Sequence, residues 1–267
     1  MVKKNYNKSL NLAIIFFAFF IFLIIVSLIC KAVVLINKSI FDGENQLTIE
    51  IIGDKGRNKL ISFSPKNNSI YIVDVINTEG NKNIKSALEI PVDKFIYTKK
   101  NISEKNLKQT LFLYSIPFLK DKTDLTIVDF IRLFLYANSV PSNSLYTKEI
   151  SLKNDFNLIK NSGIYSFFID PKIAEEKVSI EIINGTDVYG LGNKLASFVS
   201  NTGGNVIMVS NADKEELSSK IIYFEEENYT VKKLARILNL KKEKTKNKKF
   251  GEVTIIIGKD SLDDLKF

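Results

Sequence analysis

The sequence predicts an α+β protein with an N-terminal transmembrane helix, a β-rich mixed middle domain and a compact βαββαβ C-terminal domain. Three observations indicate this architecture. A run of 19 residues without a charge lies near the N-terminus, short β-branched runs alternate with turn-forming residues in the middle, and strand and helix patterns alternate from residue 178 onward. We therefore expect a cytoplasmic tail at residues 1–9, a membrane helix at 10–37, a middle domain at 45–172 and a C-terminal domain at 177–262.

The composition excludes several kinds of active site. The chain has no histidine, which is the commonest general base and a common zinc ligand, and its single cysteine, Cys30, lies in the apolar run. Histidine-dependent triads, CxxC redox sites and thiolate metal sites therefore cannot be built from this sequence. We predict no catalytic residues, no cofactor and no bound metal.

The positive charge is concentrated near the apolar run. The net charge is +8, yet residues 1–40 hold five lysines and no acidic residue, residues 41–177 hold 19 basic and 17 acidic residues, and residues 178–267 hold 14 and 13. The excess in these three segments is thus +5, +2 and +1. A nearly balanced charge over most of the chain is not typical of a protein that binds a nucleic acid, so no nucleic-acid partner is expected.

Leu12–Cys30 is the core of the membrane-spanning prediction. At about 1.5 Å per residue this run is about 28 Å long, which matches the hydrocarbon core of a bilayer, about 30 Å thick. The following residues, Ala32–Ile36, extend the apolar surface, so we expect residues 12–36 to contact the lipid bilayer. A cleaved signal peptide is the alternative, but its apolar core is usually shorter and no small-residue cleavage site follows.

Lysines on the two sides of the run bear on its orientation. Lys3, Lys4 and Lys8 place the N-terminus in the cytoplasm by the positive-inside rule, and Lys31 and Lys38 on the other flank weaken this assignment. We expect a single-pass protein of the cell membrane whose C-terminal bulk is extracytoplasmic.

Three β-rich runs open the middle domain. In LTIEIIGDKGRNKLISFSPKNNSIYIVDV, which starts at Leu47, the apolar runs are separated by DKGRN and SPKNN, which are typical of turns. Further on, DLTIVDFIRLFLYANSV predicts a helix capped by Thr126, with Asp129 three residues later. We expect the core-facing side of this helix to consist of Val128, Ile131 and Leu135.

The middle segments resemble the extracytoplasmic domain of the LytR–CpsA–Psr family in SFSPKNNSIYIVDV, IPVDKFIYTKK and the helix around Leu125–Leu135. In that family, the strand corresponding to Ser69–Val75 leads into an arginine–aspartate element that handles a lipid pyrophosphate. Here the residues that follow are Ile76, Asn77, Thr78 and Glu79, and the only arginines of the chain are Arg57, Arg132 and Arg236. Because arginine suits bidentate phosphate recognition, the resemblance implies a degenerate, non-catalytic relative.

Two carboxylates, Asp74 and Asp93, lie at predicted strand ends of this region. We interpret both as isolated, solvated groups with no part in catalysis.

Three glycines follow the first strand of the C-terminal domain and raise the question of phosphate binding. Gly185 and Gly190 have the spacing of a P-loop, but Leu191 stands where that loop needs lysine. Gly190 and Gly192 begin a dinucleotide fingerprint whose third glycine is replaced by leucine. Neither motif is complete. The alternative is a turn at Asn184-Gly185, with Gly190 allowing close approach where a helix begins.

The C-terminal domain alternates strands and helices. The expected elements are, in order, Val178–Ile183, Leu191–Asn201, Asn205–Ser210, Lys220–Phe224, residues 230–240 and Val253–Ile257. Apolar residues at core spacing support both helices, namely Leu195, Phe198 and Val199 in the first and Val231, Leu234, Ile237 and Leu238 in the second.

This unit is similar to the LytR C-terminal domain of bacterial envelope proteins. The similarity is carried by strand-Asn-Gly-Thr, Gly190-Leu191, the glycine before the second strand, Asn211-Ala212, Tyr223 in the third strand and Gly258-Lys259-Asp260. It implies an extracytoplasmic accessory module of bacterial envelope proteins, and it does not imply an enzyme. If the loops after the first two strands meet, we expect a binding edge at Asn184, Gly185, Thr186, Tyr189, Gly190 and Asn211.

A basic insertion, KKEKTKNKK, precedes the last strand. One interpretation is a solvated loop. The other is contact with anionic wall polymers or lipid headgroups, each lysine contributing about 1 kcal/mol at best, through Lys241, Lys242, Lys244, Lys246, Lys248 and Lys249.

These interpretations predict a membrane-anchored extracytoplasmic protein of the cell envelope. Its expected role is non-catalytic binding or scaffolding in cell-wall assembly or glycopolymer attachment, with a cell-wall polymer or an envelope protein as partner. Two alternatives stay open: a glycopolymer phosphotransferase of the LytR–CpsA–Psr type and a transcriptional attenuator or regulator.

Overall fold

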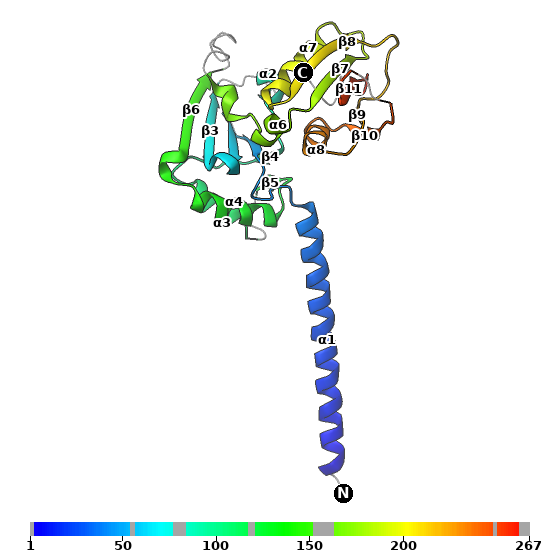
Figure 1. Ribbon diagram of the computed structural model, residues 1–267. Helices are drawn as coiled ribbons and strands as arrows, with labels where there is room; N and C mark the ends of the chain where they lie inside the picture. Colours follow the sequence, from blue (N-terminus) through cyan, green and yellow to red (C-terminus); the bar gives the residue numbers. More distant parts are fainter. Residues whose placement is uncertain are drawn as a thin grey trace.

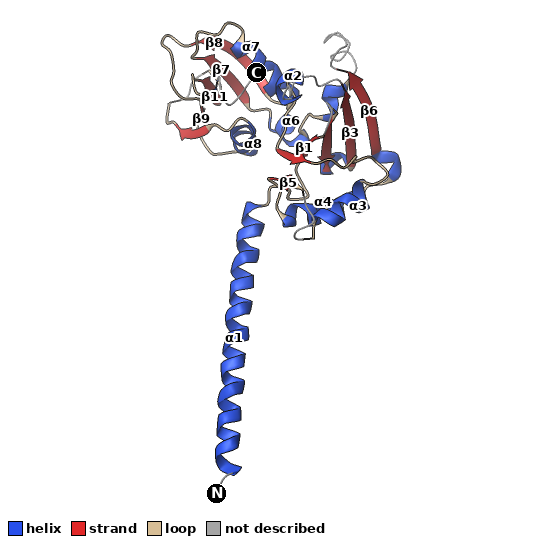
Figure 2. Ribbon diagram, turned by 180° about the vertical axis from the view of Figure 1, so that it is seen from behind, coloured by secondary structure: helices blue, strands red, loops and turns tan. Residues whose placement is uncertain are grey.

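The computed structural model describes residues 3–53, 57–76, 84–116, 121–151, 163–247 and 250–261. A long N-terminal helix leaves a globular part that contains two β-sheets (Figures 1 and 2). Five residues used in the sequence interpretation lie outside the described residues, namely Asn77, Thr78, Glu79, Lys248 and Lys249.

Helix α1 (Lys3–Lys38) confirms the predicted apolar helix. Within its part from Leu12 to Lys38, the most apolar window has a mean hydropathy of 3.3 and no buried residue, so this part is long and apolar enough to cross a membrane. Apolar side chains that none of the described residues covers need an apolar surrounding, which fits a membrane anchor.

The middle domain is built on a six-stranded sheet with the order β5-β4-β1-β2-β3-β6. Strands β1, β2 and β3 form the antiparallel meander that the three β-rich runs predict, and β4 and β6 lie parallel to its two outer strands. The strands are β1 (Leu47–Ile52), β2 (Asn58–Ser64), β3 (Ser69–Ile76), β4 (Lys94–Tyr97), β5 (Lys122–Thr123) and β6 (Leu145–Ser151).

Both faces of this sheet are covered. Helices α3 (Leu107–Tyr114) and α4 (Ile127–Ser139) pack on one face, against side chains such as Ile49 and Phe63. On the other face lie α2 (Ile84–Leu88), the short 3-10 helix η3 (Ile164–Phe167) and the C-terminal domain. Strand residues alternate between the two faces because a strand has a period of two. The remaining short helices are η1 (Pro65–Asn67), η2 (Ser142–Ser144) and α6 (Pro171–Glu176).

The start of α4 agrees with the sequence, and its buried side does not. Thr126 and Asp129 form a reciprocal capping box, as predicted. The predicted core-facing side is wrong, because Ile131 and Leu135 are exposed and Val128 is only half-buried. The helix is apolar around most of its circumference, and packing against the sheet selected the side with Phe130, Leu133 and Ala137.

Asp129 also joins the anchor helix to the middle domain. Its Oδ1 accepts hydrogen bonds from Ser39 Oγ (2.7 Å), Ile40 N (2.8 Å) and Phe41 N (2.9 Å), directly after α1 ends. One turn further along α4, Arg132 Nη1 donates to the Phe41 carbonyl (2.9 Å), and the Phe41 ring is buried among aromatic side chains. The link between anchor and domain is therefore held by polar contacts and by packing.

The C-terminal domain is a five-stranded sheet with the order β10-β9-β11-β7-β8. The predicted order of two helices and four strands is confirmed, with one strand, β10, added before the last. The strands are β7 (Ser179–Asn184), β8 (Asn205–Asn211), β9 (Lys220–Tyr223), β10 (Lys241–Lys244) and β11 (Val253–Ile257). Strands β7, β8 and β11 are mutually parallel, and β9 is antiparallel to β11.

Two helices share one core with this sheet. Helices α7 (Leu191–Asn201) and α8 (Tyr229–Ile237) bury the apolar residues that their spacing predicted, together with Ile180, Ile182 and Ile255 from the strands. The preceding α6 packs on α8, and the Glu176 carboxylate accepts hydrogen bonds from the first amides of α8, Tyr229 N (3.2 Å) and Thr230 N (2.8 Å).

Replacing Asp129 with alanine should strongly destabilise the protein. The change removes the acceptor for three groups after α1 and for the Thr126 cap, and a hydrogen bond to a charged group contributes about 1.5–3 kcal/mol. We expect a loss of about 3 kcal/mol in the free energy of unfolding, measured by denaturant titration of the full chain in detergent. The matched control is Asp124→Ala, an exposed carboxylate near the same helix, and equal losses in both variants would contradict the role of Asp129.

Candidate functional site

A hollow of about 290 Å³ opens where β7 and β8 end. The two strands run parallel, and their last residues, Asn184 and Asn211, lie opposite each other in the register. The loop after β7 and the start of α7 form the remaining walls. Five of the six residues expected at the binding edge line this hollow: Asn184, Thr186, Tyr189, Gly190 and Asn211.

Gly185, the sixth residue, has a packing role. A Cβ atom there would lie 2.6 Å from Glu216 Cβ and 2.8 Å from the Ile257 carbonyl oxygen, so no other side chain fits. Its amide donates to that carbonyl at 2.8 Å. Gly190, with a φ of 81°, precedes α7 in the left-handed region, where glycine is favoured.

Asn184 organises the wall of the hollow. Its Oδ1 accepts from Thr186 N (3.1 Å) and Thr186 Oγ1 (2.8 Å), and its Nδ2 donates to the Val188 carbonyl (3.0 Å). Thr186 Oγ1 in turn accepts from Val188 N at 3.2 Å. The Asn-Gly-Thr sequence is thus the scaffold of a turn, which agrees with the turn interpretation of this motif.

Other polar groups on the hollow face solvent. Tyr189 is fully exposed on the rim, and Asn193 and Asn211 are exposed on the walls. Gly192 brings the start of α7 close to β8, because a Cβ there would lie 3.0 Å from Val209 Cγ1. An aromatic rim above amide side chains offers a flat apolar surface next to donors and acceptors.

The basic segment begins as a strand, which corrects the loop interpretation. Lys241–Lys244 form β10, which pairs parallel with β9 at the edge of the sheet. Lys242 forms an ion pair with Glu227, and Glu243 pairs with Lys220 at 3.3 Å. All four strand residues are exposed, and strand pairing of the backbone overrides a polar sequence that by itself indicates a loop.

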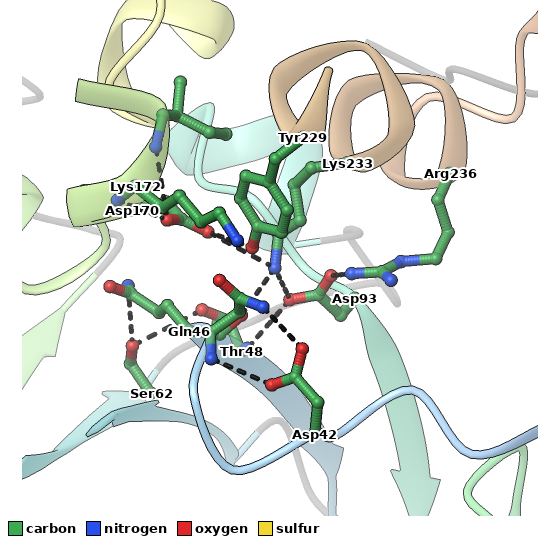
Figure 3. A network of polar contacts seen from close by, with 12 residues as sticks. Asp42, Gln46, Thr48, Ser62, Asp93, Asp170, Lys172, Tyr229, Lys233 and Arg236 are labelled. Atoms are coloured by element: carbon green, nitrogen blue, oxygen red, sulfur yellow. Dashed lines mark hydrogen bonds and ion pairs between the residues drawn. The ribbon is translucent and has the colours of Figure 1, made fainter. Parts of the chain in front are cut away.

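A second cluster, buried between the two domains, was not predicted from the sequence (Figure 3). Lys233 of α8 points into the middle domain, and its Nζ donates to the Gln46 carbonyl (2.6 Å) and to Asp93 Oδ2 (2.9 Å). The same Nζ lies 3.7 Å from Asp170 Oδ2. All three charged side chains are at most 2% exposed. The sequence did hold an indication that Lys233 is buried, because Lys233 lies one helical turn from the core residue Ile237 and therefore on the same side of the helix.

Asp93 is therefore not solvated, contrary to the sequence interpretation. Besides Lys233, its side chain accepts from Arg236 Nη2 (2.8 Å) and from the Thr48 amide (2.9 Å). Burial by itself would raise the pKa of Asp93, but the charges of Lys233 and Arg236 and these hydrogen bonds hold it below its usual value. Asp74 is not isolated either, since it pairs with Lys59 across β2 and β3.

Asp170, the residue directly before α6, is the second carboxylate of the cluster. Its Oδ1 caps α6 by accepting from Lys172 N (3.0 Å), and its Oδ2 accepts from Tyr229 Oη (2.7 Å). Burial, followed by the negative charge of Asp170, raises the pKa of the Tyr229 hydroxyl, which stays protonated as a donor. Each carboxylate thus meets more than one donor, as a buried charge requires.

Further polar contacts join the domains beside this cluster. Lys85 Nζ of α2 donates to the Ile237 carbonyl at the end of α8 (2.7 Å) and lies 5.6 Å from the centre of the Phe198 ring. Asn201 Nδ2 donates to the Glu89 carbonyl (3.0 Å). Nearby, Glu50 is buried in β1, and burial raises its pKa to about 7 although Asn58 donates to it.

Two of the three arginines hold the structure together. Arg132 binds the segment after α1, and Arg236 binds Asp93 between the domains. Neither lines the hollow.

Residues 177–260 match the family described as LytR cell envelope-related transcriptional attenuator. The predicted resemblance is confirmed, and this part of the chain is a LytR C-terminal domain. The protein is therefore related to the cell envelope. No curated protein sequence matches the chain.

Solved structures show only remote likeness. TagT from B. subtilis is 13% identical with a TM-score of 0.28, over 42% of this chain and 80% of TagT. A second TagT structure, bound to LIIa-WTA, has a TM-score of 0.27. Lin1025 from Listeria innocua is 11% identical with a TM-score of 0.18, over 83% of this chain and 95% of that one. Scores this low carry no argument, so the resemblance of residues 45–172 to the LytR–CpsA–Psr family stays a prediction.

Replacing Lys233 with methionine should loosen the contact between the domains. Methionine keeps an unbranched apolar stem, one atom shorter than that of lysine, but leaves Asp93 and Asp170 without a buried cation between them, and such a change costs about 3–5 kcal/mol. We expect a loss of about 3 kcal/mol in the free energy of unfolding, measured by denaturant titration. Lys232→Met, at the exposed neighbouring position, is the control, and a loss no larger than in this control would refute the role of Lys233.

The stability of the protein should depend on the protonation of Glu50. Because its pKa is raised to about 7 in the folded state, its protonated form is stabilised by folding, and this contribution is lost as pH rises from about 4.5 to 7. Glu50→Gln should remove this loss and raise the free energy of unfolding at pH 8 by about 2 kcal/mol. Unfolding titrations between pH 5 and 8 test this. The exposed control Glu149→Gln should keep the pH dependence of the original protein, and a Glu50→Gln profile that also keeps it would contradict the assignment.

Proposed function

We propose that the protein is a single-pass membrane protein that binds or scaffolds a cell-wall glycopolymer outside the membrane without catalysing a reaction. The observation that carries this proposal is the polar hollow at the ends of β7 and β8, which belongs to the domain that matches an envelope family. The LytR C-terminal domain would be the binding module and the middle domain its support.

The chemistry of the hollow suits a sugar chain. Exposed Tyr189 offers an aromatic face on which a sugar ring can pack, and the amides of Asn193 and Asn211 can donate to and accept from hydroxyl groups. The hydrogen bonds of Asn184 fix the loop that carries Tyr189, so this loop would lose little conformational entropy when a ligand binds.

The engagement of the arginines supports a non-catalytic role. Arg132 and Arg236 are bound within the fold, and a glycopolymer phosphotransferase would need free cationic groups around a pyrophosphate. The lysines before the apolar run support an extracytoplasmic location of the two domains. A regulator acting on nucleic acid would have to lie in the cytoplasm.

Binding to isolated cell-wall sacculi tests the proposal. We expect the full chain in detergent to co-sediment with sacculi, and the double variant Tyr189→Ala/Asn211→Ala to bind at least five-fold more weakly. Both side chains are exposed, so their removal should leave folding intact. Phe250→Ala is the matched control, because Phe250 is an aromatic residue of the same domain that is 79% exposed and does not line the hollow.

A salt series separates the hollow from the basic segment. A variant with glutamine at Lys241, Lys242, Lys244 and Lys246 should lose only the salt-sensitive part of the binding. Loss of all binding in this variant would assign the contact to the basic segment. Absence of binding at low salt would contradict the proposal and point to a protein partner in the envelope, and turnover of a polyprenyl-pyrophosphate-linked polymer would support the phosphotransferase alternative.

A further inference from the structure

The middle domain has a continuous apolar surface that nothing in the described part of the chain covers. On α4, Ile131 and Leu135 are 43% and 61% exposed, and on and after α3, Phe112 and Ile116 are 48% and 37% exposed. The Phe112 ring lies 5.4 Å from the Phe134 ring, so the patches on the two helices adjoin. We name this surface the α3–α4 face, formed by Phe112, Ile116, Ile131, Phe134 and Leu135.

Such a surface indicates a contact. Singly scattered apolar residues are normal on a protein surface, but a contiguous group marks an interaction site. Helix α4 is apolar on both sides, and a helix of this kind is usually covered on both. The sheet covers one side, with Phe130 and Leu133, which leaves the α3–α4 face for a second partner.

The α3–α4 face lies on the side of the anchor helix. In both views α3 and α4 lie at the end of the globular part from which α1 leaves, and α4 runs across the direction of α1 (Figures 1 and 2). Since the inner sides of both helices pack on the sheet, their exposed side chains point away from it, toward the anchor side.

The link to the anchor keeps this face close to the membrane boundary. Apolar side chains of α1 continue to Ile36, and the three residues after Lys38 are bound to Asp129 at the start of α4. Leu135 lies six residues after Asp129, which is about 9 Å along the helix axis. The α3–α4 face therefore stays within a short distance of the point where α1 leaves the bilayer.

We propose that the α3–α4 face lies in the interfacial region of the same bilayer that holds α1, as a second membrane contact of the protein. This inference rests on the membrane anchoring in the proposed function. An apolar helix face at the level of the headgroups gains from burial in the acyl boundary. At the nearby β4–β5 edge, Tyr97 is half exposed and Lys122 Nζ lies 5.5 Å from the centre of its ring, a pair suited to a membrane–water interface.

The length of the anchor supports this contact. The apolar stretch of residues 12–36 would be about 37 Å long as a helix, which exceeds the hydrocarbon core by about 7 Å. A helix longer than the core adapts by tilting. Because α1 is firmly joined to α4, a tilt toward α4 would press the α3–α4 face against the lipid surface.

The depth of single labelled residues tests the proposal. The full chain, with Cys30→Ala, is placed in nanodiscs of phosphatidylethanolamine and phosphatidylglycerol, and a bimane label is attached to cysteine at one position. The test variants are Leu135→Cys and Phe112→Cys. The control in the C-terminal domain is Leu217→Cys, which is 77% exposed, and the control in the anchor is Ile21→Cys.

Doxyl-labelled lipid should quench the labels at Leu135 and Phe112 at least three-fold more than the label at Leu217. If the labels at Leu135 and Phe112 are quenched no more than the label at Leu217, while the label at Ile21 is strongly quenched, the proposed second membrane contact is overturned and the membrane anchoring by α1 is not. Protection of the Leu135 label from aqueous iodide without quenching by lipid would also overturn it, because a protein would then cover the face. Absence of quenching at Ile21 would overturn the membrane anchoring and this inference with it.

Discussion

The arrangement of the two domains depends on one interaction, the buried ion pairing of the Lys233 ammonium group with two carboxylates. It lies between Asp93 of the middle domain and Asp170, which caps the helix that packs on the C-terminal domain. Removing charges from water is costly, so a pair this deep is stable only when each carboxylate has several donors. Arg236, Tyr229 and backbone amides supply them. Two polar residues around the start of β1, Gln46 and Thr48, are buried beside this cluster, and the Gln46 carbonyl accepts a hydrogen bond from Lys233.

A second polar contact has the same character at the other end of the middle domain. Asp129 binds the amides that follow α1, and Arg132 binds the carbonyl of Phe41. The anchor, the middle domain and the LytR C-terminal domain are thus joined by directional contacts of charged groups. These contacts connect the hollow beside Tyr189 and the α3–α4 face to the anchor through groups that the structure describes.

Several elements follow from the sequence because their signals are local. The apolar run of α1 is long and apolar enough to cross a membrane, and the turn residues between the β-rich runs separate β1, β2 and β3. The Thr126–Asp129 cap joins two residues that are three positions apart. The alternation of strands and helices after residue 178, with the Asn-Gly-Thr turn, was enough to predict the LytR C-terminal domain.

The sequence by itself therefore determined α1, α4, α7 and α8, most strands and the identity of the C-terminal domain, since these depend on residues close together in the chain. The shorter helices α2, α3 and α6 were not predicted. Only the tertiary structure decided which side of α4 is buried, because both sides are apolar and the sheet selects Phe130 and Leu133. It also decided that Asp93 is paired, since its partners Lys233 and Arg236 lie 140 and 143 residues away. Burial and charge pairing are properties of surfaces that meet in space, and no local pattern records them.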